Sequence, residues 1–285
     1  MSNFKFNFHG DTKDEVNEDS IEANKGIVWL ECDKVIPDQQ IQQLDNIVTR
    51  AKIFTCGDIE IGHIIVSEAL TNVKDAGIKN MVNLAEQEHS DLVIGKYEGG
   101  LKIWECTNDL MNYLSENQDT VKLNNKYVLD LGCGAGILGI YAFMNGASVT
   151  FQDYNKEVLE YVTIPNVLLN IDEDERSTEI KRCQFYSGDW ESFDKKLDKS
   201  YVYDLILTSE TIYNTNNYEK LLNIFINRLS KDGIVYVAAK TYYFGVGGSM
   251  RQFEETVKKN EGLKCQICWK NTDGIQREIL QVTRT

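Results

Sequence analysis

Strand patterns alternate with helical patterns from residue 127 to residue 260, and this alternation restricts the fold more than any other feature of the chain. Strands are predicted at 127–131, 148–152, 183–187, 203–208 and 234–239. Helices are predicted at 137–145, 155–169, 217–230 and 250–260, with only a short loop after residue 187. Such an order is typical of a mostly parallel sheet covered by helices on both faces, so we expect an α/β, Rossmann-like fold.

The end of the chain follows a different pattern. Strand patterns at 263–269 and 275–283 are joined by Asn271–Gly274, which contains the Asp-Gly pair typical of hairpins. The last strand should therefore run antiparallel and complete a seven-stranded sheet. Ahead of the sheet, Ile103, Leu110 and Leu114 recur at helical spacing, which predicts a helix ending near Ser115.

The N-terminal part divides into two regions before the main domain at 91–285. Residues 11–24 hold six acids and one lysine, so we expect residues 1–25 to form a flexible acidic tail. Residues 26–90 contain a strand-like stretch, a helix-like stretch after Pro37, and short strands with a helix. We interpret them as an extension of the main domain.

Composition limits the partners and the compartment. The net charge of −14 would repel nucleic-acid phosphates and suits a basic partner, although it also serves solubility alone. Seven cysteines cannot all pair, and residues 1–10 show no secretory leader, so a reducing compartment is expected. No apolar run reaches the ~18 residues of a membrane span. We expect a soluble monomer in the cytoplasm, with the nucleus as a second candidate compartment.

The strongest local motif is Val128–Ile140, VLDLGCGAGILGI. Gly132, Gly134 and Gly136 follow a buried strand and precede a helix. Glycine permits positive φ and a close approach of the backbone to a ligand, here at the carboxyl end of a strand. Asp153 ends the next strand, where a carboxylate can bind both hydroxyls of a ribose. A nucleotide-like cofactor is therefore predicted.

Two cofactors agree with this motif. Gly134-x-Gly136-x-x-Gly139 also satisfies the dinucleotide fingerprint, which keeps a nicotinamide dehydrogenase open as an alternative. S-adenosylmethionine is favoured by the glycine spacing, by the C-terminal hairpin, and by Asp130, which suits a cofactor that carries an amino group. After the third strand, Gly188, Asp189 and Trp190 could contact an adenine, or form an ordinary loop filled by an aromatic ring.

Four segments together resemble the METTL-type histidine protein methyltransferases, which are seven-β-strand enzymes dependent on S-adenosylmethionine. These segments are EGGLKIWECT at 98–107, DLGCGAGILGI at 130–140, FQDYN at 151–155 and DLILTSETIYN at 204–214. The resemblance extends from about Ser90 to Gly248 and is poor over residues 11–60. It implies methylation of the tele nitrogen of a histidine in a large-subunit ribosomal protein.

The resemblance also implies cofactor contacts, residue by residue. These are Ile103, Trp104, Glu105, Cys106 and Thr107 at the methionine end, Gly132 in the glycine loop, Gln152, Asp153 and Tyr154 at the ribose, Gly188, Asp189 and Trp190 at the adenine, and Ser209 after the fourth strand. Glu210–Tyr213 looks like the acid-x-x-Tyr motif that related protein methyltransferases place at the substrate channel.

Histidine chemistry suits this motif. A neutral imidazole, with an unperturbed pKa of about 6.5, is nucleophilic at neutral pH, whereas lysine at about 10.4 must first lose a proton. The enzyme therefore needs a group that selects a tautomer and accepts the imidazolium product. Glu210 is the catalytic candidate, and Tyr213 could orient the ring or line the pocket. Glu210 could instead be an ordinary acid at a helix N-terminus.

Other readings of the chain remain. The same fold could methylate a lysine or a small molecule, or serve as a non-catalytic adaptor that binds S-adenosylmethionine. No metal site is predicted, because Cys265 and Cys268 face opposite sides of a strand and His9, His63 and His89 are scattered. Tyr242, Tyr243 and Phe244 could form an aromatic wall of the substrate cleft.

Overall fold

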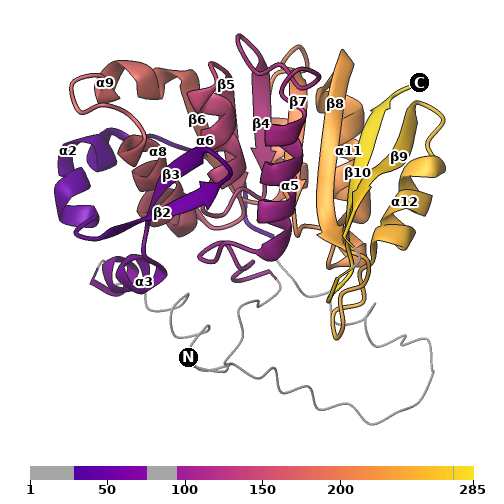
Figure 1. The fold of residues 1–285 in the computed structure, drawn as a ribbon, viewed down its shortest axis with the longest axis horizontal. Helices are drawn as coiled ribbons and strands as arrows, with labels where there is room; N and C mark the ends of the chain where they lie inside the picture. Colours follow the sequence, from indigo (N-terminus) through magenta and orange to yellow (C-terminus); the bar gives the residue numbers. More distant parts are fainter. Residues whose placement is uncertain (1–28, 76–94, 272) are drawn as a thin grey trace.

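The computed structural model describes residues 29–75, 95–271 and 273–285, which form an eight-stranded sheet with helices on both faces (Figure 1). The strand order is β1-β6-β5-β4-β7-β8-β10-β9. The strands of this sheet are β1 (Asp33–Val35), β4 (Tyr127–Leu131), β5 (Ser148–Asp153), β6 (Cys183–Ser187), β7 (Tyr203–Ser209), β8 (Leu229–Lys240), β9 (Leu263–Lys270) and β10 (Arg277–Arg284).

The helices alternate with these strands, as expected. They are α2 (Asp38–Ile47), α3 (Val66–Asp75), α5 (Glu105–Glu116), α6 (Ile137–Met144), α7 (Lys156–Val158), the π-helical turn η1 (Leu159–Thr163), α8 (Ile164–Leu169), α9 (Arg176–Glu179), η2 (Ile180–Arg182), α10 (Trp190–Lys196), η3 (Thr215–Asn217), α11 (Tyr218–Arg228) and α12 (Met250–Lys258). A separate hairpin consists of β2 (Ala51–Cys56) and β3 (Ile59–Ile64).

Strands β4 to β10 form the predicted seven-stranded sheet. β4 pairs in parallel with β5 and with β7, so that Val128 lies between Val149 and Leu205. β10 runs antiparallel to both β8 and β9, which confirms the C-terminal hairpin. Because β5, β4 and β7 are parallel neighbours, their carboxyl ends meet at one edge of the sheet.

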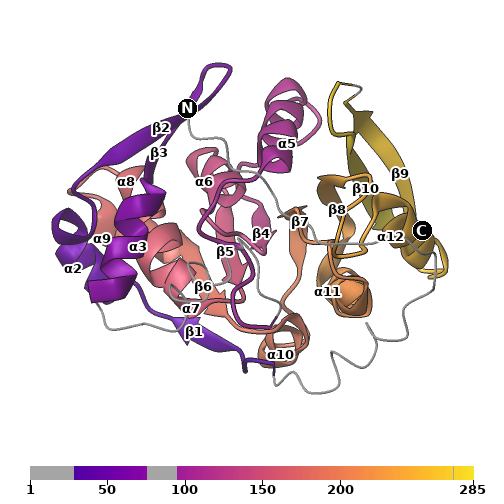
Figure 2. The ribbon, with the colours of Figure 1, turned by 90° about the horizontal axis from the view of Figure 1, so that it is seen from below.

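Successive residues of the strands pack alternately into two hydrophobic cores, one on each face of the sheet. Val128 belongs to the core beneath α5, α6 and α8, whereas Leu129 belongs to the core beneath α10, α11 and α12. Figure 2 shows these two helical layers on opposite sides of the sheet. Cys265 and Cys268 pack against different cores, as the strand pattern predicted.

The N-terminal extension packs directly on the main domain. β1 lies in the strand-like stretch predicted before Pro37 and adds an eighth, antiparallel strand beside β6, a pairing that the sequence pattern did not predict. The β2–β3 hairpin lies on α8, where the side-chain amides of Asn166 and Asn170 accept hydrogen bonds from the backbone N–H groups of Ile64 and Gly62 at 2.8 and 2.9 Å.

Two predicted boundaries were wrong. The expected loop after residue 187 contains α10, because Asp189 caps this helix by accepting a hydrogen bond from Glu191 N at 3.0 Å and Phe193 is buried beneath it. β8 begins at Leu229, five residues earlier than expected. Leu229 is buried directly after the end of α11, and it already pairs with Tyr203 of β7.

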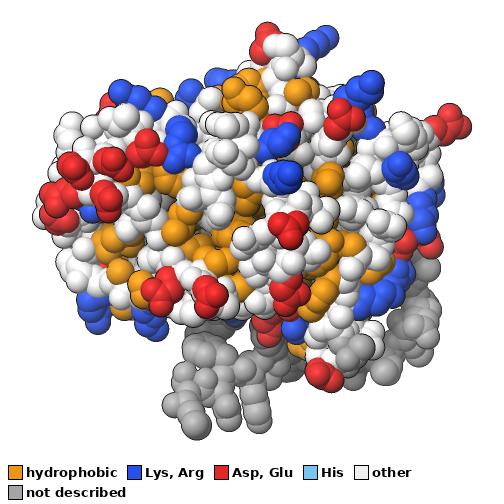
Figure 3. All heavy atoms as spheres, turned by 45° about the horizontal axis from the view of Figure 1, so that its top comes forward, with side chains coloured by type: hydrophobic (Ala, Val, Ile, Leu, Met, Phe, Trp, Pro, Cys, Tyr) orange, Lys and Arg blue, Asp and Glu red, His pale blue; other side chains and the backbone are white. Residues whose placement is uncertain are grey.

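Several predictions fall on residues that the structure does not describe. These are the acidic tail 1–25, the boundary near residue 90, and His9 and His89. Within the described ranges, no helix is both long and apolar enough to cross a membrane. On the face shown in Figure 3, acidic and basic side chains are interspersed among apolar groups.

Arg228 joins α11 to α10 and so supports the helix whose start borders the pocket described below. Its side chain is 5% exposed, and its Nε donates to Asp194 Oδ1 at 2.5 Å. Its guanidinium also donates to the backbone oxygens of Asp194, Leu197, Asp198 and Tyr201.

We expect Arg228→Met to lower the free energy of unfolding by about 3 kcal/mol, because it leaves Asp194 and several carbonyl oxygens without their partner in a buried place. Urea denaturation measures this loss. The exposed Lys195–Glu191 pair provides the control, and Lys195→Met should leave the midpoint unchanged within error. Equal midpoints for Arg228→Met and wild type would contradict the assignment.

Candidate active site

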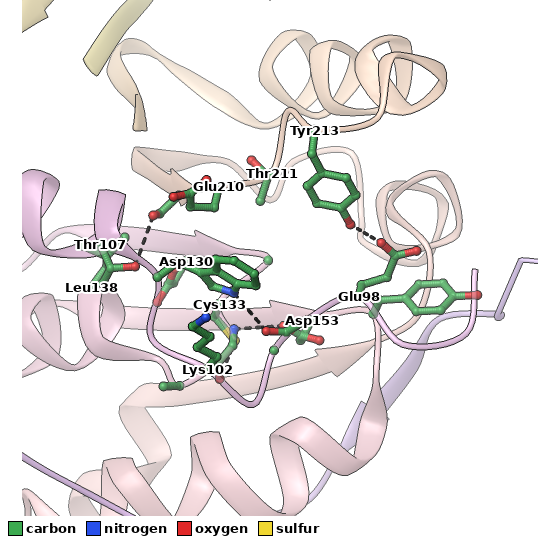
Figure 4. Close-up of a pocket in the computed structure, with 18 of the residues that line it drawn as sticks. Glu98, Lys102, Thr107, Asp130, Cys133, Leu138, Asp153, Glu210, Thr211 and Tyr213 are labelled. Carbon is green, nitrogen blue, oxygen red and sulfur yellow. Dashed lines mark hydrogen bonds between the residues drawn. The ribbon is translucent and has the colours of Figure 1, made fainter. Parts of the chain in front are cut away.

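A pocket opens at the carboxyl ends of β4, β5, β6 and β7, which is where open α/β sheets bind ligands (Figure 4). Its hollow measures about 870 Å³ when the space open to solvent is included. The glycine loop, the ends of β5 and β6, the loop after β7 and the segment before α5 line it.

The glycine loop presents bare backbone to this pocket. Gly132, Gly134 and Gly136 have φ values of +67°, +50° and +75°, which side chains rarely adopt. A Cβ on Gly132 would also lie 2.7 Å from Thr211 Cγ2. The loop therefore requires glycine for conformation and for space.

Two buried carboxyl groups end the neighbouring strands β4 and β5. Asp153 Oδ2 accepts a hydrogen bond from Gly134 N at 2.9 Å, and Asp130 Oδ2 accepts one from Gly139 N at 2.8 Å. Burial raises the pKa of Asp153 to about 6 and that of Asp130 to about 8. An ammonium group of a ligand beside Asp130 would favour its ionised form.

The predicted adenine end is held together by Gln152. This side chain is fully buried; its Nε2 donates to Gly188 O at 2.7 Å, and its Oε1 accepts from Trp190 Nε1 at 2.9 Å. Gln152 thus positions the loop after β6 from behind. Lys220 Nζ, on α11, lies 2.6 Å from Asp189 Oδ1 and 3.8 Å from the centre of the Trp29 ring.

The opposite end of the pocket lies at the start of α5. Trp104 Nε1 donates to Gly99 O at 3.0 Å, and Lys102 Nζ lies 4.7 Å from the centre of the Trp104 ring. A hydrogen bond of 3.1 Å between the hydroxyls of Thr107 and Ser209 joins α5 to the end of β7. This end therefore combines an aromatic wall with small hydroxyl groups.

Glu210 stands beside Ser209 in a strained backbone conformation, with φ of +59°. Its Oε2 accepts a hydrogen bond from Tyr243 Oη at 2.6 Å. Its Oε1 is buried and has no hydrogen-bond partner, although Lys240 Nζ lies 3.7 Å away. Burial and the adjacent Glu210 raise the pKa values of Cys106 and Tyr243 well above their usual range. One carboxylate oxygen is thus free for a ligand.

Tyr213 lies apart from Glu210 and points to Glu98 (Figure 4). Its hydroxyl donates a short hydrogen bond to Glu98 Oε2, which joins the loop after β7 to the segment before α5. Burial and Glu98 raise the pKa of Tyr213 well above its usual range, and burial also raises the pKa of Glu98. A direct role of Tyr213 in orienting a substrate ring stays a prediction.

Most of the predicted site residues lie together at the pocket wall. These are Ile103, Trp104, Thr107, Asp130, Gly132, Gly134, Asp153, Tyr154, Gly188, Asp189, Trp190, Ser209, Glu210 and Tyr213. The wall does not include Glu105, Cys106, Gly136 or Gln152. Successive side chains of a helix or strand point in different directions, which explains why neighbours of wall residues face elsewhere.

Those four residues have other surroundings. Glu105 is exposed, with Oε2 3.7 Å from Lys240 Nζ, and Cys106, the next residue of α5, is fully buried. Gly136 begins α6, and a Cβ there would lie 2.9 Å from Thr163 Cγ2. The pocket therefore gives no support to their predicted cofactor contacts, and Gln152 acts by positioning Trp190.

Several other residues line the pocket although the sequence analysis assigned them no role in the site. Glu98 and Thr211 lie within the segments 98–107 and 204–214 that carry the family resemblance, so their positions could have indicated a place in the site. Trp29 and Asn217 carried no such signal, because they come from the N-terminal extension and from the start of α11. The wall also contains Gly99, Gly100, Lys102, Cys133, Ala135, Ile137 and Leu138.

The pocket fits S-adenosylmethionine. Gly132 and Gly134 line its wall with backbone that carries no side chain, the acid at the end of β5 suits a ribose, and aromatic residues flank the loop after β6. Together with the strand order, this arrangement defines a class I S-adenosylmethionine-dependent methyltransferase fold.

Comparisons with known proteins identify the family within this class. The family model described as lysine methyltransferase matches residues 86–255. The chain is 45% identical over 198 residues to a histidine protein methyltransferase 1 homolog of Dictyostelium discoideum, covering 69% of this chain and 61% of that protein. The Bos taurus homolog is 42% identical over 227 residues, with 72% and 60% covered.

A longer match is found with the histidine protein methyltransferase 1 homolog of Rattus norvegicus, which is 36% identical over 282 residues. It covers 92% of this chain and 74% of the rat protein. The chain belongs to the histidine protein methyltransferase 1 family, whose methyl donor is S-adenosylmethionine. It spans about three fifths of the Dictyostelium and bovine relatives.

The pKa of Asp153 predicts a pH dependence of cofactor affinity. A ribose hydroxyl donates to an ionised carboxylate, and protonation below the pKa of about 6 removes this acceptor. We expect the affinity for S-adenosylhomocysteine to be about tenfold weaker at pH 5 than at pH 7. Calorimetry from pH 5 to pH 8 measures the profile.

Asp153→Asn is the control, because an amide does not titrate. Its affinity should be lower and nearly independent of pH over this range. Asp130 and Glu98 also have raised pKa values, and any slope that persists in Asp153→Asn belongs to them. A flat wild-type profile would show that Asp153 does not bind the ribose as a carboxylate.

Proposed function

We propose that this protein transfers a methyl group from S-adenosylmethionine to the tele nitrogen of a histidine in a basic protein. The names of the relatives support the reaction. The observation that carries the proposal is the buried Oε1 of Glu210 beside the pocket, which accepts no hydrogen bond and has only Lys240 Nζ at 3.7 Å as an ionic neighbour. A carboxylate oxygen in this state is suited to a ligand that brings its own N–H donor.

Glu210 would select the reactive tautomer of the target histidine. The Nδ1–H group of a neutral imidazole can donate to Glu210 Oε1, which leaves the lone pair of Nε2, the tele nitrogen, free to react. Tyr243 Oη fixes the carboxylate through Oε2, at 2.6 Å. Glu210 thus orients the ring, and afterwards it can take the Nδ1 proton of the imidazolium product.

The same carboxylate argues for histidine over lysine. Lysine must lose a proton from a pKa of about 10.4 before it can react, and a nearby anion stabilises the protonated ammonium. Imidazole is already neutral at pH 7 and gains its charge during the reaction, when Glu210 can stabilise it. A lysine or a small molecule remains the second candidate acceptor because the matched family model is described as lysine methyltransferase.

When bound, S-adenosylmethionine supplies an electrophilic methyl group on a sulfonium. The chain supplies position and exclusion of water. Trp104 forms a wall whose indole N–H is held by Gly99 O at 3.0 Å. The Thr107–Ser209 hydrogen bond fixes α5 against the end of β7 at 3.1 Å. Lys240 Nζ lies near Glu210 and offsets its charge before an imidazolium forms.

The loop after β8 offers a surface for the target protein. Tyr242, Phe244 and Val246 are 47%, 74% and 39% exposed, while Tyr243 between them reaches back to Glu210. These side chains would contact residues on either side of the target histidine. The net charge of −14 supports a basic target, for which we propose a large-subunit ribosomal protein. We further propose a monomer that works in the cytoplasm or the nucleus.

The decisive test labels an extract of cells that lack this protein, using the purified chain and tritiated S-adenosylmethionine. We expect the label in tele-methylhistidine of one basic band after acid hydrolysis. A synthetic peptide around the labelled site should be methylated, and its His→Ala counterpart should not. Label in methyl-lysine would establish the second candidate instead, and cofactor binding without any label would indicate a non-catalytic adaptor.

Glu210 should be required for turnover and dispensable for cofactor binding. We expect Glu210→Ala and Glu210→Gln to lower kcat by about 10²- to 10³-fold, because alanine removes the acceptor for Nδ1–H and glutamine removes the negative charge that stabilises the imidazolium. Their affinity for S-adenosylhomocysteine should stay within about threefold of wild type. The exposed Glu219→Gln on α11 is the matched control and should leave both values unchanged. Wild-type kcat in Glu210→Gln would refute this role.

A further inference from the structure

Asn217 occupies the N-cap position of α11, yet its side chain does not cap the helix. Asparagine at this position normally accepts a hydrogen bond from the first turn. Here the residue is 8% exposed, lines the pocket, and has a fully buried Oδ1 without a hydrogen-bond partner. A buried polar atom of this kind calls for a partner from outside the protein.

Asp189, which the resemblance places at the adenine, already has two protein partners. Asp189 Oδ1 accepts from Lys220 Nζ at 2.6 Å, and Oδ2 accepts from Glu191 N at 3.0 Å. Asp189 therefore caps α10 and holds Lys220, and its remaining lone pairs stay available to the adenine, as those of Asp153 stay available to the ribose. Asn217 offers an unused polar side chain on the same wall.

The surroundings of Asn217 place it at the adenine end. Lys220 follows three residues later, so the two side chains emerge from the same side of the helix start. Lys220 contacts Asp189 and lies 3.8 Å from the centre of the Trp29 ring. Trp29 in turn makes an edge contact with Tyr154, with ring centres 5.9 Å apart. Trp29 and Tyr154 therefore supply aromatic rings, and Lys220 a charge, near the Asn217 amide.

We propose that the side-chain amide of Asn217 recognises the adenine edge of the cofactor and makes the site specific for a 6-amino purine. An amide presents one acceptor and one donor group, which match the amino group and the adjacent ring nitrogen of adenine. This assignment rests on the proposed use of S-adenosylmethionine, and it adds a specificity-determining residue to that site.

Calorimetry with two ligands tests the assignment without any turnover. S-inosylhomocysteine differs from S-adenosylhomocysteine by an oxygen in place of the 6-amino group and a proton on the adjacent nitrogen. Wild-type protein should bind the adenosyl ligand at least tenfold more tightly. Asn217→Ala should bind it about tenfold more weakly than wild type, with little change for the inosyl ligand, so that the preference is largely lost.

Asn217→Ser separates recognition from folding, because serine is also favoured at a helix N-cap. It should melt like wild type and show the same loss of preference. Asn223→Ser, at an exposed position of the same helix, should behave as wild type. Unchanged preference in both Asn217 variants, or equal weakening of both ligands, would overturn the assignment.

The outcomes also separate this assignment from the proposed function. Failure of wild-type protein to bind S-adenosylhomocysteine would refute the proposed cofactor itself. Normal binding and preference without methylation of histidine would refute the proposed reaction and leave the role of Asn217 supported.

Discussion

The hydrogen bond between Gly134 N and Asp153 Oδ2 connects the ends of β4 and β5, and the pocket is organised around it. It requires a left-handed glycine in the first loop and a buried acid at the end of the next strand. Both elements depend on a parallel sheet whose carboxyl ends meet at one edge. The fold thereby brings a bare backbone loop and a carboxyl group to the same small volume.

The two ends of the pocket hold unsatisfied polar atoms of different character. At one end Glu210 keeps a buried carboxylate oxygen free, in a backbone conformation that costs of order 1–3 kcal/mol. At the other end Asn217 keeps an amide oxygen free. Such costs are tolerated where ligands supply the missing partners. We infer that a charge-accepting ring nitrogen and a purine edge are the two ligands that the wall is built to receive.

The contact between Glu98 and Tyr213 closes the wall between these two ends. It joins the segment before α5 to the loop after β7, two regions that are 115 residues apart in the chain. The aromatic loop after β8 packs on the same region through Gly248 N, which donates to Tyr213 O at 3.0 Å. The pocket and the proposed target-binding surface are therefore connected through the backbone of one loop.

The sequence by itself determined the sheet, its antiparallel end and the glycine loop, because period-two burial, Asp-Gly and spaced glycines are local signals. It also placed Glu210 correctly beside the pocket, through a motif directly after a strand. Gln152, predicted at the ribose, lies behind the wall, because one position along β5 turns a side chain from the pocket to the interior.

Only the tertiary structure decided which distant residues complete the wall. Trp29 reaches it because β1 pairs antiparallel with β6 at the edge of the sheet, and nothing local to residue 29 encodes that pairing. Asn217 begins α11, but its side chain makes no capping hydrogen bond, and the residue lines the pocket. Local sequence patterns specify strands and turns. Contacts between distant segments depend on how all the elements pack around the hydrophobic cores.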